Sequence, residues 1–294
     1  MPETNLSGTG VALVTPFNDD LNIDFNAFEK ILKHTIDGKV DYFVVQGTTG
    51  ESVTVTENEK KEILHFVKSF EPGKPVVFGI GGNDTRKVLH AIDNYSAEKI
   101  DAILSVCPYY NKPSQAGLIN HFTMIADHSP FPVILYNVPG RTSVNLTAES
   151  TAILSRHSNI IGVKEASGSF TQCAEIAGSA DKDFLLISGD DLFTLPMMTV
   201  GCKGVISVLA NAIPDLMSSM VNYALKGNFT EAGRVLLKMT GINPHMYSEG
   251  NPTGVKYLME LQGLCKRIVR PPLAAPSESL QKKIRDEFEK IKRG

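Results

Sequence analysis

Short apolar runs recur along the first two thirds of the chain, and segments with helical spacing separate them. Eight of these runs are almost continuously apolar rather than alternating, which is typical of parallel strands buried on both faces. We therefore predict strands at residues 10–15, 42–46, 75–80, 102–106, 132–136, 160–164, 184–188 and 204–208.

The segments between the runs carry apolar residues every three or four positions, as amphipathic helices do. The first contains Phe25, Phe28, Leu32 and Ile36, and the second contains Ile63, Phe66, Val67 and Phe70. Thr56 and Glu59 have the spacing of a capping box at the start of the second helix.

Eight strand–helix repeats with no change of composition predict a (β/α)8 barrel over residues 1–208. An open, doubly wound sheet would more often stop at about five to seven strands. The chain has 294 residues, and a barrel of this kind typically needs about 250. Residues 209–294 show helical spacing without further strand-like runs, so we predict a C-terminal helical extension packed on the barrel.

Candidate chemistry lies where the predicted strands end, because barrels of this kind place their active sites at the carboxyl ends of the strands. Lys164 ends the sixth run, and Tyr136 ends the fifth. Neighbouring strands lie ~4.8 Å apart, so the two side chains are expected to meet. A partly desolvated lysine amine is a nucleophile toward carbonyls, and condensation with a keto acid would give a Schiff base.

Other polar residues at strand ends could assist such an amine. Thr48 could complete a proton relay with Tyr136, and the glycine-flanked Thr48–Thr49 turn could cradle a carboxylate. Arg141 suits a bidentate hold on a second carboxylate. Taken singly, each of these residues has an ordinary structural explanation, such as a snorkelling lysine, a rim tyrosine, a plain turn or a surface ion pair.

Several chemistries are disfavoured by what the strand ends lack. None of the 7 histidines follows a predicted strand, which argues against a metal-dependent barrel enzyme and against a Ser-His-Asp arrangement. Asp190 and Asp191 would repel a phosphate near the seventh strand. The 4 cysteines lie far apart without a Cys-x-x-Cys pair, so we expect reduced core thiols.

Composition indicates an ordinary globular protein. Hydrophobic residues make up 42% of the chain and charged residues 21%, which allows a large core. A formal net charge of -3 gives no basic surface for nucleic acid or membrane. The N-terminus lacks the features of a signal peptide, and no stretch reaches the ~20 apolar residues of a membrane span, so we predict a cytoplasmic location.

Five motifs taken together resemble the dihydrodipicolinate synthase family. In chain order they are Gly-Thr-Thr-Gly-Glu at 47–51, Pro-Tyr-Tyr-Asn-Lys-Pro-Ser at 108–114, Tyr-Asn-Val-Pro-Gly-Arg at 136–141, Val-Lys-Glu-Ala-Ser-Gly at 163–168 and Ser-Gly-Asp-Asp at 188–191. The resemblance covers essentially the whole chain. It implies a lyase that condenses pyruvate with L-aspartate 4-semialdehyde on the way to diaminopimelate and lysine, with no cofactor or metal.

The resemblance also implies roles for individual residues. Lys164 would form the imine, while Tyr136, Thr48 and Tyr110 would relay protons, with Tyr110 entering from a neighbouring subunit of a dimer or a dimer of dimers. The remaining implied residues bind substrate: Thr49 at the carboxylate of pyruvate, Arg141 at the carboxylate of the semialdehyde, and Gly189 and Ile206 along the pocket.

Two further expectations follow from the resemblance. Lysine-inhibited relatives bind lysine at a dimer interface, and the corresponding positions here are Asn83, Lys87 and Lys60 beside Tyr109. Two ammonium groups would repel lysine, so we expect weak or absent feedback inhibition. The alternatives are a keto-acid aldolase such as N-acetylneuraminate lyase, against which Arg141 and Thr49 argue, and a non-catalytic keto-acid sensor.

Overall fold

The computed structural model describes residues 5–70 and 73–293, and it confirms the predicted barrel. Eight strands close in chain order, and the neighbouring pairs run parallel. They are β1 (Gly8–Ala12), β2 (Tyr42–Val45), β3 (Val76–Gly79), β4 (Ala102–Val106), β5 (Val133–Asn137), β6 (Ile160–Glu165), β7 (Leu185–Ser188) and β8 (Gly204–Ser207).

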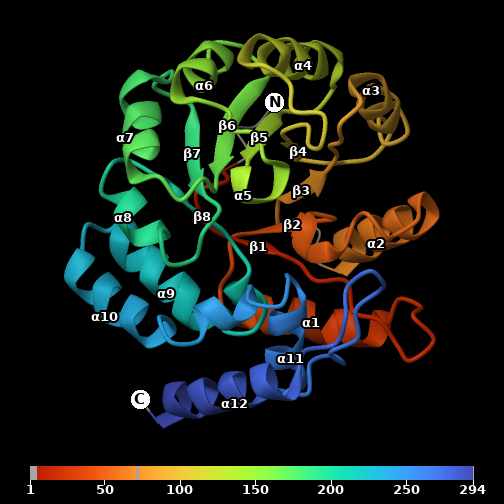
Figure 1. Ribbon diagram of the computed structural model, residues 1–294, viewed down its shortest axis with the longest axis vertical. Helices are drawn as coiled ribbons and strands as arrows, with labels where there is room; N and C mark the ends of the chain where they lie inside the picture. Colours follow the sequence, from red (N-terminus) through yellow and green to blue (C-terminus); the bar gives the residue numbers. More distant parts are fainter. Residues whose placement is uncertain (1–4, 71–72, 294) are drawn as a thin grey trace. The chain divides into compact units, whose positions relative to one another are not determined.

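Helices separate the strands and fill the C-terminal region (Figure 1). They are α1 (Phe25–Asp37), α2 (Glu57–Phe70), α3 (Thr85–Asp93), α4 (Gln115–His128), α5 (Pro139–Thr142), α6 (Ala148–Leu154), α7 (Phe170–Ser179), α8 (Thr194–Met198), α9 (Pro214–Leu225), α10 (Phe229–Met239), α11 (Thr253–Glu260) and α12 (Glu278–Arg293). Short 3-10 turns occupy η1 (Thr48–Gly50), η2 (Leu209–Asn211) and η3 (Asn243–Met246).

The strands are buried along almost their whole length, which explains why their sequences do not alternate. Every residue of β1, β2, β5 and β8 is buried. The first strand differs most from its predicted position, because it begins at Gly8 and ends at Ala12. The apolar residues that follow it, Leu13 and Val14, are buried outside the strand, where Val14 N–H donates to Asn211 Oδ1 at 3.0 Å.

The chain divides into two compact units. One unit comprises Pro75–Ile206 together with the N-terminal residues up to Ser7. The other comprises Gly8–Lys74 and Ser207–Gly294. Within this second unit α9 packs beside α10, and α11 beside α12 (Figure 1). The C-terminal helices therefore share a unit with the first two strands.

Local sequence signals explain how the first two helices form and pack. Thr56 and Glu59 make the predicted capping box, because Thr56 N–H donates to Glu59 Oε2 at 2.8 Å and Glu59 N–H donates to Thr56 Oγ1 at 3.3 Å. Phe66 of α2 packs against Phe25 and Phe28 of α1, with ring centroids 5.0 and 5.9 Å apart.

All four cysteines are buried and unpaired, as expected for core thiols. Burial raises the pKa of Cys107 to about 12, with a further contribution from the nearby Glu165 carboxylate. A thiol with such a pKa stays protonated at neutral pH and behaves as a small apolar side chain.

His121 of α4 generates a prediction about pH. This residue is 4% exposed, and its Nδ1 lies 2.8 Å from Thr85 Oγ1. Burial lowers the pKa of His121 from 6.5 to about 4, so the unfolded chain takes up a proton at a higher pH than the folded chain does. Above pH ~6.5 the neutral His121 does not reduce the free energy of unfolding. Below that pH the free energy of unfolding falls as the pH drops toward ~4, and at pH 5 it is lower by about 2 kcal/mol. Urea unfolding at pH 7.5 and pH 5 should show this loss in the native chain and a smaller one in His121→Gln; equal losses would contradict the assignment.

Candidate active site

Lys164 and Tyr136 are paired across two neighbouring strands. They are register partners at the ends of β6 and β5. Their side chains lie in contact, with the Lys164 Nζ atom 4.4 Å from the centroid of the Tyr136 ring. Both are largely buried, at 6% and 7% exposure. The predicted meeting of these two side chains is thus confirmed by the geometry.

The Lys164 amine has no counter-charge among the residues that the structure describes, since no carboxylate oxygen lies within 4.0 Å of its Nζ atom. A second buried lysine shows the usual arrangement. Lys256 is 0% exposed, and its Nζ atom lies 2.5 Å from Glu51 Oε1 and 2.7 Å from the Ile268 carbonyl oxygen. Buried amines are normally paired in this way, because an isolated buried charge is expensive. Among the described residues, Lys164 therefore departs from the usual pairing of a buried amine.

Gly189 forms a wall against the Lys164 side chain. Its N–H donates to the Glu165 carbonyl oxygen at 2.8 Å. A Cβ atom at this position would lie 3.0 Å from Lys164 Cε and 2.7 Å from Ala166 Cβ, so only glycine fits. Ile206, which was also predicted to line the pocket, is buried in β8, and β8 pairs with β7 through Val205 and Ser188.

A buried polar cluster sits on the opposite face of the same two strands. Asn137 and Glu165 are the next register pair after Tyr136 and Lys164, and alternate residues of a strand point to opposite faces. Glu165 Oε2 accepts hydrogen bonds from Asn137 Nδ2 and Gln172 Nε2, both at 3.0 Å, and its Oε1 accepts from Ser167 N–H at 2.6 Å. This cluster fixes the strand ends that carry Lys164 and Tyr136.

The second unit holds the Thr48–Thr49 turn. Thr48 is half-buried, and its hydroxyl bonds to none of the described side chains or carbonyls. Thr49 is 3% exposed, and its Oγ1 accepts a hydrogen bond from Asn251 Nδ2 at 3.0 Å. The turn ends at Glu51, whose backbone is left-handed, with φ 55. Thr15 Oγ1 donates to the Gly50 carbonyl oxygen at 2.7 Å and so ties the turn to the segment after β1.

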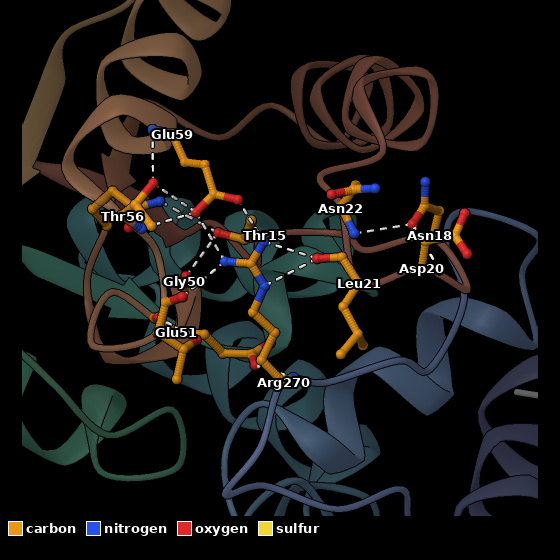
Figure 2. Close-up of polar contacts among 12 residues, drawn as sticks. Thr15, Asn18, Asp20, Leu21, Asn22, Gly50, Glu51, Thr56, Glu59 and Arg270 are labelled. Carbon is orange, nitrogen blue, oxygen red and sulfur yellow. Dashed lines mark hydrogen bonds and ion pairs between the residues drawn. The ribbon is translucent and has the colours of Figure 1, made fainter.

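Arg270 lies beside this turn and donates hydrogen bonds to several segments of the second unit (Figure 2). Its backbone N–H donates to Glu51 Oε2 at 2.9 Å, and its guanidinium donates to the carbonyl oxygens of Leu21 and Thr54 and to both carboxylate oxygens of Glu59. The hydrogen bond from Arg270 lowers the pKa of Glu59 to about 2.

Glu51, Lys256, Arg270 and Glu59 thus form one polar network in the second unit. Removing one partner of a buried ion pair such as Glu51–Lys256 costs about 3–5 kcal/mol, so this network is costly to break.

Sequence reasoning missed this network and the Glu165 cluster. Lys256 falls within an ordinary helical segment, and Arg270 reads as part of a proline-rich connector. A usable signal did exist for Glu165, because an acidic residue at the end of an apolar run must find hydrogen-bond partners when it is buried.

Tyr110 and Arg141 are on the surface of the chain. The Tyr110 side chain is 88% exposed, and its backbone is left-handed, with φ 76. Neither residue has a side-chain hydrogen bond or ion pair with any part of the chain that the structure describes. Both side chains are thus available to a ligand or to a second chain.

Residues 5–70 and 73–293 contain no group of three or more His, Cys, Asp or Glu residues that could hold a metal ion. Nor do they contain a helix that is long and apolar enough to cross a membrane.

A closed (β/α)8 barrel with an unpaired, buried lysine at a strand end is typical of enzymes that use a lysine amine as a nucleophile. The comparison with known proteins is more specific. The profile of the Dihydrodipicolinate synthetase family matches residues 5–291, and the chain belongs to this family. The prediction of the family, and of an enzyme of this type, is confirmed.

Individual relatives agree with this assignment. The 4-hydroxy-tetrahydrodipicolinate synthase of Cytophaga hutchinsonii is 46% identical over 287 residues, which cover 97% of each chain. The dihydrodipicolinate synthase of Thermotoga maritima superposes with a TM-score of 0.95 at 32% identity, covering 97% of this chain and 98% of that one. The enzyme of Cyanidioschyzon merolae, solved with lysine bound, gives a TM-score of 0.93 at 35% identity, covering 97% and 98%.

Gly189→Ala tests the close approach to Lys164. The added methyl group must displace Lys164 or Ala166. Because misplacing a reacting group by about 1 Å can cost 10²-fold in rate, we expect kcat to fall about 10- to 100-fold in a folded protein. Gly178→Ala is the matched control, because a Cβ atom there meets nothing within 4 Å. Steady-state kinetics and thermal melting of both variants provide the measurement, and full activity of Gly189→Ala would refute the contact.

Proposed function

We propose that this chain condenses pyruvate with L-aspartate 4-semialdehyde to give 4-hydroxy-tetrahydrodipicolinate, through a Schiff base on Lys164. The observation that carries the proposal is the buried Lys164 amine, which contacts Tyr136 and lacks a carboxylate partner among the described residues. The name shared by the curated relatives supports the choice of reaction.

The chemistry follows from the amine. Lys164 Nζ attacks the keto carbon of pyruvate, and the keto oxygen leaves as water. The resulting imine withdraws electrons, so the pyruvate methyl group loses a proton and becomes an enamine carbon, which attacks the aldehyde carbon of the second substrate. The amino group of that substrate then closes the ring at the imine carbon and releases Lys164.

These steps need protons to be moved and carboxylates to be held. We assign the proton relay to Tyr136, Thr48 and Tyr110, with Tyr110 contributed by a second copy of the chain, since it is 88% exposed. Thr49 would hold the pyruvate carboxylate, and Gly189 and Ile206 would line the pocket.

Arg141 is assigned to the carboxylate of the semialdehyde. Its guanidinium is exposed on α5 and has no carboxylate partner among the described residues, so it can take a bidentate ligand. The active form would be a homodimer or a dimer of such dimers, because Tyr110 serves the neighbouring site. We also propose a cytoplasmic location for the enzyme.

Borohydride reduction in the presence of pyruvate tests the imine. Peptide mass analysis should find a reduced pyruvate adduct on Lys164 and none on Lys256, which is 0% exposed. Arg141→Ala should keep this adduct, while its kcat/KM for the semialdehyde falls about 100-fold.

The control for Arg141 is Arg234→Ala, which removes an exposed arginine that pairs with Glu231 on α10. Absence of the Lys164 adduct would overturn the mechanism. An adduct without semialdehyde-dependent turnover would instead favour a keto-acid aldolase.

Feedback inhibition by lysine is expected to be weak. Lys87 of α3 is exposed and has no ion-pair partner within the described part of the chain, whereas the Lys60 ammonium lies 2.7 Å from Glu57 Oε1. Lys87 is therefore the stronger source of repulsion toward a second ammonium group. Turnover measured with millimolar L-lysine should stay near its uninhibited value, and Lys87→Glu should increase the inhibition. Strong inhibition of the native chain would contradict this expectation.

A further inference from the structure

We propose that Asn251 is a positioning residue that sets the direction of the Thr49 hydroxyl and so prepares it to bind a carboxylate. This inference rests on the proposed role of Thr49. It assigns a part in substrate binding to the region C-terminal to the last strand, where Asn251 lies between η3 and α11.

The geometry of the pair fixes which way the hydroxyl points its hydrogen. Asn251 Nδ2 donates to Thr49 Oγ1 at 3.0 Å, and both residues are buried, at 7% and 3% exposure. A threonine hydroxyl has one hydrogen to donate and can accept with its lone pairs. Because the amide N–H is the donor in this contact, the hydroxyl hydrogen points elsewhere.

That hydrogen has no acceptor within the described part of the chain. A buried O–H without an acceptor is costly, and native structures rarely leave one unless a ligand supplies it. A carboxylate oxygen is an acceptor only, so it matches the open hydrogen of Thr49. Asn251 adds no charge of its own, which keeps the pair from repelling an anion.

The hydrogen-bonding state of Asn251 indicates that its contact with Thr49 has a purpose beyond filling space. Its Oδ1 atom is buried and has no hydrogen-bond partner in residues 5–70 and 73–293. The bond to Thr49 is therefore the single polar contact that those residues give to its side chain. Retaining a buried amide for one bond fits a positioning role better than a stabilising one.

The surrounding network keeps the two side chains within hydrogen-bond distance. Glu51 directly follows η1, and its Oε1 pairs with Lys256 on α11, a few residues after Asn251. Its Oε2 accepts the backbone N–H of Arg270 at 2.9 Å. The turn that carries Thr49 and the segment that carries Asn251 are thus joined at two points, and a small change at Asn251 alters direction rather than position.

Three substitutions separate this role from a structural one. Asn251→Asp keeps the shape but can only accept, so Thr49 turns its hydrogen toward position 251, and we expect the KM for pyruvate to rise about 30-fold. Asn251→Leu removes the bond but leaves the hydroxyl free to rotate, and a rise of about fivefold is expected. In both variants kcat at saturating pyruvate should change less than the KM. Asn222→Leu, on the exposed side of α9, should leave both constants unchanged.

A double-mutant cycle with Thr49→Val completes the test. If Asn251 acts through the hydroxyl, Asn251→Leu has little further effect on the pyruvate KM when Thr49 is already valine, whereas Thr49→Ser keeps the dependence on Asn251. Additive effects of Thr49→Val and Asn251→Leu would overturn the inference alone. An unchanged KM in Thr49→Val would instead overturn the proposed role of Thr49. Should Asn251→Leu fail to fold, as judged by thermal melting, Asn251→Ser takes its place in the cycle.

Discussion

Burying a lysine amine has an electrostatic cost, and the side chains around the two buried lysines reflect it. Two lysines are taken out of water, and they are treated in opposite ways. Lys256 is paired with Glu51, and although burial lowers the pKa of Lys256, the carboxylate opposes that shift. Lys164 has an aromatic face in place of a carboxylate, with its Nζ atom 4.4 Å from the centroid of the Tyr136 ring. Lys256 thus joins α11 to the residue after η1, whereas no carboxylate among the described residues pairs with Lys164.

Each arrangement depends on polar groups that the reacting side chains do not touch. Behind Lys164 and Tyr136, the Glu165 carboxylate bonds to Asn137 and Gln172 and holds the ends of β5 and β6. Beside the Thr48–Thr49 turn, Arg270 and Glu51 play the same part in the second unit (Figure 2). In both units a buried carboxylate one or two residues along the chain from a candidate site residue fixes the backbone there.

The pattern of apolar and polar positions along the sequence predicted the barrel well, because strands buried on both faces have continuous apolar runs. It also predicted that Lys164 and Tyr136 would meet, since strand ends in a barrel share a face. It misplaced the first strand, because Leu13 and Val14 are as apolar as strand residues but pack as a buried loop.

Local pattern could not identify Asn251, Lys256 or Arg270 as partners of the turn. Their contacts join positions far apart in sequence, and helical periodicity carries no information about which distant segment a helix face will meet. Tyr110 is similar, because its 88% exposure shows that its side chain is free to make a contact but does not identify the partner.

The contact between Glu51 and Lys256 spans 205 positions of sequence, and this has a consequence for biosynthesis. A ribosome releases the Thr48–Thr49 turn early, but the helix that holds it emerges only near the end of translation. Glu51 therefore has no Lys256 partner while the intervening strands and helices are being synthesised. A nascent chain would therefore contain the strand that carries Lys164 before the contact between Glu51 and Lys256 could form.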